Sequence, residues 1–451
     1  MKKTTLISST TLIALLNISG AALASGQIPD AVTDADFRNH RDGIVELGKN
    51  LMFDKILSGN RNTSCATCHH SLADTGDGLS LPVGEGGMGL GVTRNTGIGE
   101  DAIHERVPRN APPVFNLSAH EFTALFHDGR VSANDEFPSG CETPAGIELP
   151  DNLENVLACQ AMFPVTSPTE MAGQDDENEI SMAAAAGDLV LVWELLAERL
   201  QDPANGYVDL FIKAFKDIKR ESDITFAHAA NAIAAFEGTN WRADNSPFDQ
   251  YLRGDSNAMS MNAVVGMDLF YQGDSNGQAC ADCHSGKFQT DHSFHAIAMP
   301  QIGAGRGDDK DGHGDYGREQ VTKEQSDRYK FRTPSLRNIA LTAPYGHTGP
   351  YNTLRAVVEH HRDTMNAIKD YDQNQAVLPS RDDLDAMDFI VMDDNKRVKN
   401  IADASELLPF TYSDTDIDRI IDFLNALTDP GSIDLRSDTP MTVPSGIPVA
   451  E

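Results

Sequence analysis

Cys65-Ala66-Thr67-Cys68-His69 and Cys280-Ala281-Asp282-Cys283-His284 share the pattern Cys-x-x-Cys-His. Two thiols about one helical turn apart can each add to a vinyl group of a heme, and the histidine that follows can bind the iron. A Cys₄ zinc site is the main rival, but its cysteine pairs usually lie about 15–20 residues apart. Here 215 residues separate Cys65 from Cys280, and each pair carries its own histidine. The sequence therefore predicts two covalent c-type hemes, with His69 and His284 as iron ligands.

The first 24 residues have the pattern of a secretory signal peptide. Lys2 and Lys3 precede an apolar stretch over 6–16, and Ala22-Leu23-Ala24 matches the A-x-A cleavage pattern. The apolar stretch is too short for a stable membrane-spanning helix, and no later segment is long and apolar enough. We expect a mature protein that begins near Ser25 and lies in the periplasm, with an uncleaved anchor as the alternative.

The 451 residues carry a formal net charge of −32. Such a charge suits a partner with a basic surface, although a merely solvated acidic surface would explain it equally well. It argues against nucleic acid as a partner, because the phosphates would be repelled.

Cys141 and Cys159 lie outside the two motifs and enclose a short loop. In an oxidising compartment such a pair should form a disulfide. This bond would stabilise the chain by roughly 2–4 kcal/mol, so we expect a structural role.

Helical periodicity is easier to find than the alternation typical of strands. Apolar residues recur on one helix face over 189–200, 211–218 and 417–427, and Ser413 with Asp416 forms a capping box before the last of these. Between the helices lie long stretches rich in Gly, Pro and Asp, which cover residues 74–100, 132–150, 170–180 and 301–318. Loops of this length are unusual in a helical bundle, but they fit a chain wrapped around large cofactors.

We therefore expect an all-α fold with two cytochrome c-like heme domains and long loops. The predicted division is an N-terminal heme domain over 25–178, a C-terminal heme domain over 179–404, and an extension over 405–451 that packs back onto the first domain. The first boundary is set within the acidic run 175–179.

Seven further segments occur in an order that resembles the bacterial diheme cytochrome c peroxidase family, which includes MauG-like enzymes. They are Leu51-Met52-Phe53-Asp54, Pro108-Arg109-Asn110-Ala111-Pro112-Pro113-Val114, Phe126-His127-Asp128-Gly129-Arg130, Pro168-Thr169-Glu170-Met171, Asn245-Ser246-Pro247-Phe248-Asp249-Gln250-Tyr251-Leu252, Thr333-Pro334-Ser335-Leu336-Arg337-Asn338 and Leu341-Thr342-Ala343-Pro344-Tyr345-Gly346-His347. The resemblance covers most of the chain after the signal peptide.

The resemblance implies that the N-terminal heme binds peroxide and that Glu170 lies over its iron. A carboxylate there could take a proton from the inner peroxide oxygen and deliver it to the outer one. Some family members also close this iron with a histidine at rest, for which His104 is the candidate, whereas MauG-like members leave it open. His127 occupies the position of the family's tryptophan between the hemes, so a hole-hopping route through this position is in doubt.

The resemblance also implies that the C-terminal heme transfers electrons and has a distal ligand in the segment after Thr353. The family's methionine or tyrosine is replaced here by His361, with His360 as the competing ligand. Adjacent residues on a helix point about 100° apart, so only one of the two can face the iron. Two histidine ligands should lower the reduction potential relative to histidine and methionine.

One calcium ion is the third cofactor that the resemblance implies. Its protein ligands map to the Asn110 side chain and to the carbonyl groups of Thr342 and Pro344, oxygen ligands that suit a hard cation. The acidic loop over 308–315 lacks a terminal bidentate acid at the right spacing, so we expect a solvated turn there.

Together these features predict a periplasmic peroxidase that reduces hydrogen peroxide with electrons from a small redox protein, a cytochrome c or a cupredoxin. A MauG-like oxidase that modifies a partner protein is one alternative. A non-enzymatic electron-transfer cytochrome is another, although Glu170 argues against it. The oligomeric state stays open, with a homodimer among the options.

Overall fold

The computed structural model describes residues 26–174 and 176–450, and the predicted signal peptide lies outside these ranges. The α-helices are α1 (Asp42–Phe53), α2 (Cys65–Cys68), α3 (Val156–Ala161), α4 (Glu179–Ala185), α5 (Leu189–Gln201), α6 (Val208–Ala214), α7 (Phe226–Asn240), α8 (Pro247–Leu252), α9 (Met261–Gln272), α10 (Glu319–Thr322), α11 (Leu354–Arg362), α12 (Thr364–Ala367), α13 (Asp382–Asp388), α14 (Asn395–Asp403) and α15 (Asp414–Asn425). The strands are β1 (Ala124–Leu125), β2 (Val131–Ala133), β3 (Cys141–Glu142), β4 (Phe294–His295) and β5 (Phe331–Arg332). The fold is therefore mainly helical, as expected.

The short strands form two antiparallel sheets. In the first, β2 lies between β1 and β3, with Ser132 opposite both Ala124 and Glu142. In the second, β4 pairs with β5, and Phe294 lies opposite Arg332. A disulfide between Cys141 in β3 and Cys159 in α3 confirms the predicted pairing.

The periodic helices agree with the sequence, with one exception. The stripe over 189–200 is α5, and the stripe over 417–427 is mostly α15, which begins after the capping box of Ser413 and Asp416. The stripe over 211–218 is helical only as far as Ala214, because Phe215 adopts an extended backbone conformation. Both Phe215 and Ile218 are nevertheless buried.

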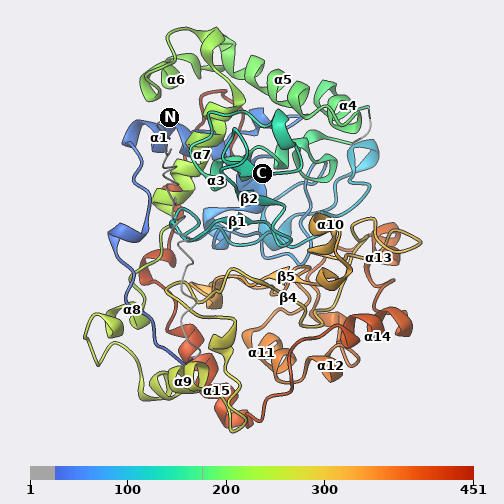
Figure 1. Ribbon diagram of the computed structural model, residues 1–451. Helices are drawn as coiled ribbons and strands as arrows, with labels where there is room; N and C mark the ends of the chain where they lie inside the picture. The colour runs from blue at the N-terminus through green and yellow to red at the C-terminus, as the bar shows by residue number, and fades with distance from the viewer. Residues whose placement is uncertain (1–25, 175, 451) are drawn as a thin grey trace, which may run out of the picture.

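Two large hydrophobic cores lie one above the other in Figure 1. The upper core contains α1, α3, α5 and α7, and the lower core contains α9 and α15. The helices over 179–240 therefore pack with the N-terminal part of the chain, and the cores divide between 243 and 248 rather than at 178. The physical reason is burial, since the apolar face of α5 and most of α7 are covered only in the upper core.

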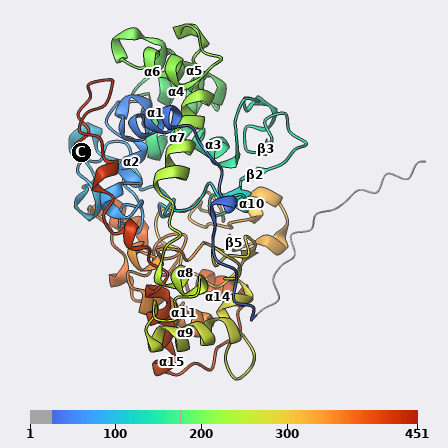
Figure 2. The ribbon, with the colours of Figure 1, turned by 90° about the vertical axis from the view of Figure 1, so that its left-hand side faces the viewer.

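Both ends of the described chain connect the two bodies. The carbonyl of Gly26 accepts a bond from Gln272 in α9, whereas the following residues lead up to α1 (Figure 1). At the other end, α15 stays in the lower core, and only the residues after it return to the upper body (Figure 2). There Val443 is buried in the upper core, and Lys55 donates to the carbonyl of Ala450 at 3.0 Å.

No helix among residues 26–174 and 176–450 combines the length and the apolar character needed to cross a bilayer.

Candidate heme-binding sites

The first Cys-x-x-Cys-His motif forms a single helical turn, α2, that begins after Ser64. His69 follows this turn, and its Nδ1 lies 3.1 Å from the carbonyl oxygen of Thr75. Because that carbonyl can only accept, Nδ1 carries the proton and Nε2 keeps the lone pair that a metal needs. Burial lowers the pKa of His69, which favours the neutral imidazole. The side chain is therefore prepared as an iron ligand.

A cavity with about 1290 Å³ of space between atoms, its open mouth included, lies beside His69. Its walls contain Cys65, Cys68, His69 and Glu170, so the structure brings the predicted residues of the N-terminal site together. Both cysteines and the histidine of the motif face the same space, as the covalent attachment of a heme would require.

Besides Arg109, three arginines line this cavity and give it a cationic wall. Arg130 comes from the upper body, whereas Arg306 comes from a loop and Arg332 from strand β5 of the lower body. The buried Nε of Arg306 has no hydrogen-bond partner among the described residues. Arg332 donates to the carbonyl of Phe126, and burial lowers its pKa to about 10. Because a heme carries two propionate groups, its negative charge would compensate these partly buried cations.

Glu170 lies on a π-helical turn over Pro168–Ala172 and faces the same cavity. A Cβ atom at Gly84 would lie 2.0 Å from the carbonyl oxygen of Thr169, so a glycine there lets the neighbouring loop support this turn closely. Burial raises the pKa of Glu170, while the charges of Arg130 and Arg306 oppose that rise. A carboxyl held in this balance can both accept and release a proton.

The second motif lies in the lower body and, unlike the first, has another histidine opposite its own. The ring of His361, from α11, faces that of His284 at a centroid distance of 6.5 Å. A metal–imidazole bond is about 2 Å long, so one iron fits between two rings at this separation. Nδ1 of His284 lies 3.1 Å from the carbonyl of Gln289, and Nδ1 of His361 lies 2.7 Å from that of Val357. Both Nε2 atoms therefore keep their lone pairs.

His360, the competing ligand, has both ring nitrogens engaged elsewhere. Nδ1 lies 2.9 Å from the Tyr351 hydroxyl, and Nε2 lies 2.8 Å from the carbonyl of Ile297. The ring is buried against Tyr351, at a centroid distance of 5.1 Å. This geometry favours His361 over His360.

The two histidines discussed for the region of the first heme lie in different surroundings. His127 lines the cavity, and its Nε2 lies 3.0 Å from the carbonyl of Asn110. Burial lowers the pKa of His127 to about 4, so the ring is neutral at physiological pH. His104 is exposed and is not part of the cavity wall, so in this conformation it does not close the site.

The predicted calcium ligands lie in neighbouring segments. The backbone N–H of Asn110 donates to the carbonyl of His347 at 2.9 Å, and its side-chain Nδ2 donates to that of Leu79 at 2.8 Å. Thr342 and Pro344 lie just before His347 in the chain, on either side of Ala343. Calcium binding at these residues stays a prediction.

The acidic loop over 308–315 is not wholly solvated, contrary to expectation. Asp315 is 3% exposed and receives two bonds from Arg109, at 2.7 and 2.8 Å. Arg109 also donates to the buried Asp128 at 2.6 Å. Burial alone would raise the pKa of Asp315, but Arg109 outweighs it and lowers the value to about 2.

A further carboxyl of the first cavity escaped the sequence analysis. Glu237, on α7, lines the wall, and burial raises its pKa to about 8. Within the described ranges, the only group of three potential metal ligands close enough to share an ion is Cys283, Asp291 and His295. The two cysteine pairs therefore do not combine into the Cys₄ site that zinc would need.

Comparison with known proteins agrees with this arrangement. Residues 42–257 match the family model of the di-haem cytochrome c peroxidases. The methylamine utilization protein MauG of Methylorubrum extorquens is 34% identical over 318 residues, which cover 70% of this chain and 68% of that protein. The cytochrome c551 peroxidase of Pseudomonas aeruginosa is 30% identical over 334 residues, 73% of this chain and 75% of the relative.

Solved structures show the same fold. A MauG-like protein associated with microbial copper homeostasis superposes with a TM-score of 0.56 at 23% identity, covering 91% of this chain and 96% of that one. The diheme peroxidase BthA from Burkholderia thailandensis gives a TM-score of 0.56 at 19% identity over 90% of this chain and 91% of its own. The chain therefore belongs to the di-haem cytochrome c peroxidase family and is an oxidoreductase with two heme cofactors.

Proposed function

We propose that this protein is a periplasmic c-type diheme peroxidase that reduces hydrogen peroxide. One observation carries the proposal: Glu170 faces the cavity of His69 beside two arginines, whereas His284 has a second histidine opposite it. A site with a free side can bind a small oxidant, and a site closed by two ligands can only pass electrons.

In the first site, the heme would be held by Cys65, Cys68 and His69, and its iron would supply the redox chemistry that splits the peroxide bond. The Glu170 carboxylate would take the proton from the inner peroxide oxygen and hand it to the outer oxygen. The charges of Arg130 and Arg306 would favour the ionised carboxylate before the transfer. Over the whole reaction, one peroxide, two electrons and two protons give two water molecules.

In the second site, Cys280 and Cys283 would hold the heme, and His284 and His361 would bind its iron. Two imidazole ligands favour a low reduction potential. The electrons would come from a small redox protein, a cytochrome c or a cupredoxin. The net charge of −32 suits a donor with a basic face.

A MauG-like oxidase that modifies a partner protein is the second candidate. The 34% identity to MauG of Methylorubrum extorquens favours it. A purely electron-transferring cytochrome is less well supported, because the buried carboxyl of Glu170 would then face a closed iron.

Three finer points belong to the same proposal. Residues 1–24 would direct export and be removed. One calcium ion would bind the Asn110 side chain and the carbonyls of Thr342 and Pro344. A homodimer is compatible with the proposal but is not required by it.

Peroxide titration of the purified holo-protein tests the catalytic assignment. The wild type should show a high-spin ferric signal that peroxide removes, and Glu170→Gln should react at least about 100-fold more slowly, the usual size of a lost acid–base group. Glu194→Gln, an exposed carboxyl on α5, is the control. Unchanged reactivity of Glu170→Gln would remove this residue from the mechanism. Steady turnover with a reduced small cytochrome would separate the peroxidase from the protein oxidase.

A further inference from the structure

The loop after the second heme-binding motif, residues 285–290, contacts a buried ion pair whose two residues lie elsewhere in the chain. Arg337 donates from Nη1 to Asp249 at 2.6 Å and from Nε to the carbonyl of Lys287 at 3.0 Å. Nη2 donates to the same carbonyl. Arg337 is 2% exposed and Asp249 is fully buried, so water does not weaken the pair.

The same short loop orients the imidazole of His284. The carbonyl of Gln289 accepts the bond from Nδ1 of His284 at 3.1 Å. The amide of the buried Gln289 donates to the carbonyl of Gly286 at 3.1 Å and to the Tyr271 hydroxyl at 3.3 Å. The ion pair thus fixes the carbonyl of Lys287. Two residues later, the carbonyl of Gln289 fixes the imidazole of His284.

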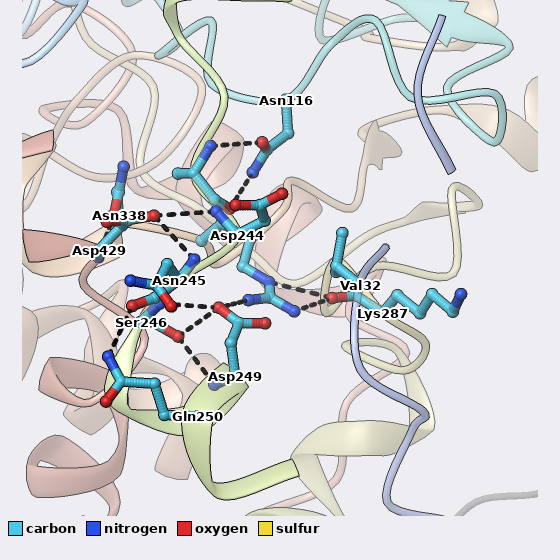
Figure 3. Close-up of polar contacts among 12 residues, drawn as sticks. Val32, Asn116, Asp244, Asn245, Ser246, Asp249, Gln250, Lys287, Asn338 and Asp429 are labelled. Atoms are coloured by element: carbon cyan, nitrogen blue, oxygen red, sulfur yellow. Dashed lines mark hydrogen bonds and ion pairs between the residues drawn. The ribbon is translucent and has the colours of Figure 1, made fainter. Parts of the chain in front are cut away.

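Asp249 is itself anchored where the chain passes between the two cores (Figure 3). Its Oδ2 accepts bonds from the backbone N–H of Ser246 at 2.9 Å and from its hydroxyl at 2.6 Å. Nearby, the carboxylate of Asp429 accepts from the N–H of Asp244 at 2.9 Å, and Asn338 accepts from the N–H of Asp429 at 2.8 Å. The position of Asp249 is therefore fixed by contacts that do not involve the 285–290 loop.

The second carboxylate oxygen of Asp249, Oδ1, is buried and has no hydrogen-bond partner among the described residues. A desolvated carboxylate that is only partly hydrogen-bonded is costly, and the charge of Arg337 is what offsets this cost. Retaining a charge here, rather than a neutral side chain, points to a role beyond packing.

We propose that the Asp249–Arg337 pair is a positioning device for the C-terminal heme. The pair fixes the 285–290 loop so that Gln289 keeps its bond to His284, and in this way it sets the reduction potential of that heme. A hydrogen bond to Nδ1–H makes a metal-bound histidine more basic, which favours the oxidised iron. This inference rests on the proposed ligation of the iron by His284.

The first motif is supported differently. Thr75, whose carbonyl holds His69, is tied through its hydroxyl to the backbone N–H of Val114 at 3.1 Å, a neutral contact. Changes to the ion pair should therefore alter the C-terminal heme and spare the N-terminal one, which serves as an internal reference.

The test uses two variants of the purified holo-protein. Asp249→Asn keeps the size of the side chain but leaves the charge of Arg337 uncompensated and weakens its hold on the 285–290 loop. Both effects should raise the reduction potential of the C-terminal heme. Arg337→Lys keeps the charge but cannot bind the carboxylate and the carbonyl with one planar group, so a smaller rise is expected. Potentiometric titration followed optically gives the potential of each heme, and electron paramagnetic resonance reports the low-spin signal.

Asp388→Asn is the matched control, because it breaks another buried pair, between Arg106 and Asp388, whose side chains are 2% and 4% exposed. It should lower the melting temperature and leave the C-terminal potential unchanged. The proposal is overturned if Asp249→Asn lowers the melting temperature alone, or if both hemes shift equally. If Asp249→Asn does not fold, Arg337→Lys decides. Failure of the proposed function itself would show in the wild type, as the absence of a low-spin bis-histidine signal.

Discussion

Replacing Arg109 by methionine should destabilise the protein strongly, and the size of the loss should depend on pH. Arg109 binds Asp128, 19 residues later, and Asp315, 206 residues later, with all three side chains at most 6% exposed. Asp315 ends the loop that carries Arg306. The guanidinium therefore joins a loop of the lower body to the wall of the first heme cavity.

The magnitude follows from the charges. The pKa of Asp315 falls from 3.8 to about 2, which corresponds to roughly 2 kcal/mol of stabilisation. Asp128 is lowered as well, by Arg109 and Arg130. Removing the shared cation from a buried pair typically costs about 3–5 kcal/mol, because an uncompensated charge stays behind.

The stability of the wild type and that of Arg109→Met should change with pH in opposite directions. In the wild type the depressed pKa of Asp315 gives a stabilisation that is complete above about pH 4 and is lost as the pH falls toward 2. In Arg109→Met, burial without the cation should raise the pKa of Asp315 above its unfolded value, whereas Arg130 still opposes such a rise at Asp128. The variant then loses stability as the pH rises from 4 toward 7, so the gap to the wild type should be widest at pH 7.

Urea denaturation of the holo-proteins at pH 7 and pH 4, followed by circular dichroism, measures this gap. Arg436→Met is the control, because its pair with Asp434 is exposed and should contribute little. Equal midpoints for Arg109→Met and the wild type at pH 7, or a gap that widens toward pH 4, would refute the reasoning.

Three further changes have clear expected outcomes. His361→Ala should convert the C-terminal heme from low spin to high spin in its electronic spectrum. His360→Ala should keep the low-spin spectrum, since only His361 faces His284. The reverse result would exchange the roles of the two histidines. Removing calcium with a chelator should lower the melting temperature of the wild type but not that of Asn110→Ala, as followed by calorimetry; an equal loss in both would place the ion elsewhere. Cys141→Ala should reduce the free energy of unfolding by about 2–4 kcal/mol in urea titration, because the loop to Cys159 is no longer closed; no loss would mean that the bond is not structural.

The parts of the sites that could be predicted are those encoded by neighbouring residues. The Cys-x-x-Cys-His motif brings its own ligand, and the turn around Glu170 is a short, recognisable segment. The family resemblance already favoured His361 as the distal ligand, with His360 as the competitor, and the contacts of His360 with Tyr351 and Ile297 support that choice.

Pairings between distant charges could not be predicted. Arg306 lies in a loop with many acidic neighbours, and nothing local indicates that it reaches the first heme cavity. The division of the two hydrophobic cores differs from the predicted boundary for a related reason. An amphipathic stripe such as that of α5 shows that one face is buried, but not against which core. In the sequence the acidic run at 175–179 resembles a linker, yet its last residue, Glu179, already begins α4.

The two sites begin from the same five-residue pattern and become different through what faces the histidine. In both, a backbone carbonyl holds Nδ1 and leaves Nε2 for iron, so the proximal side is nearly the same. The opposite side decides the chemistry. In the proposed function, the second imidazole would close the iron of His284 and leave it only electrons to exchange. Beside His69 the facing group is the carboxyl of Glu170, which can move a proton. Since reduction of peroxide needs both electrons and protons, the proposed division of these tasks between two sites would follow from one residue opposite each motif.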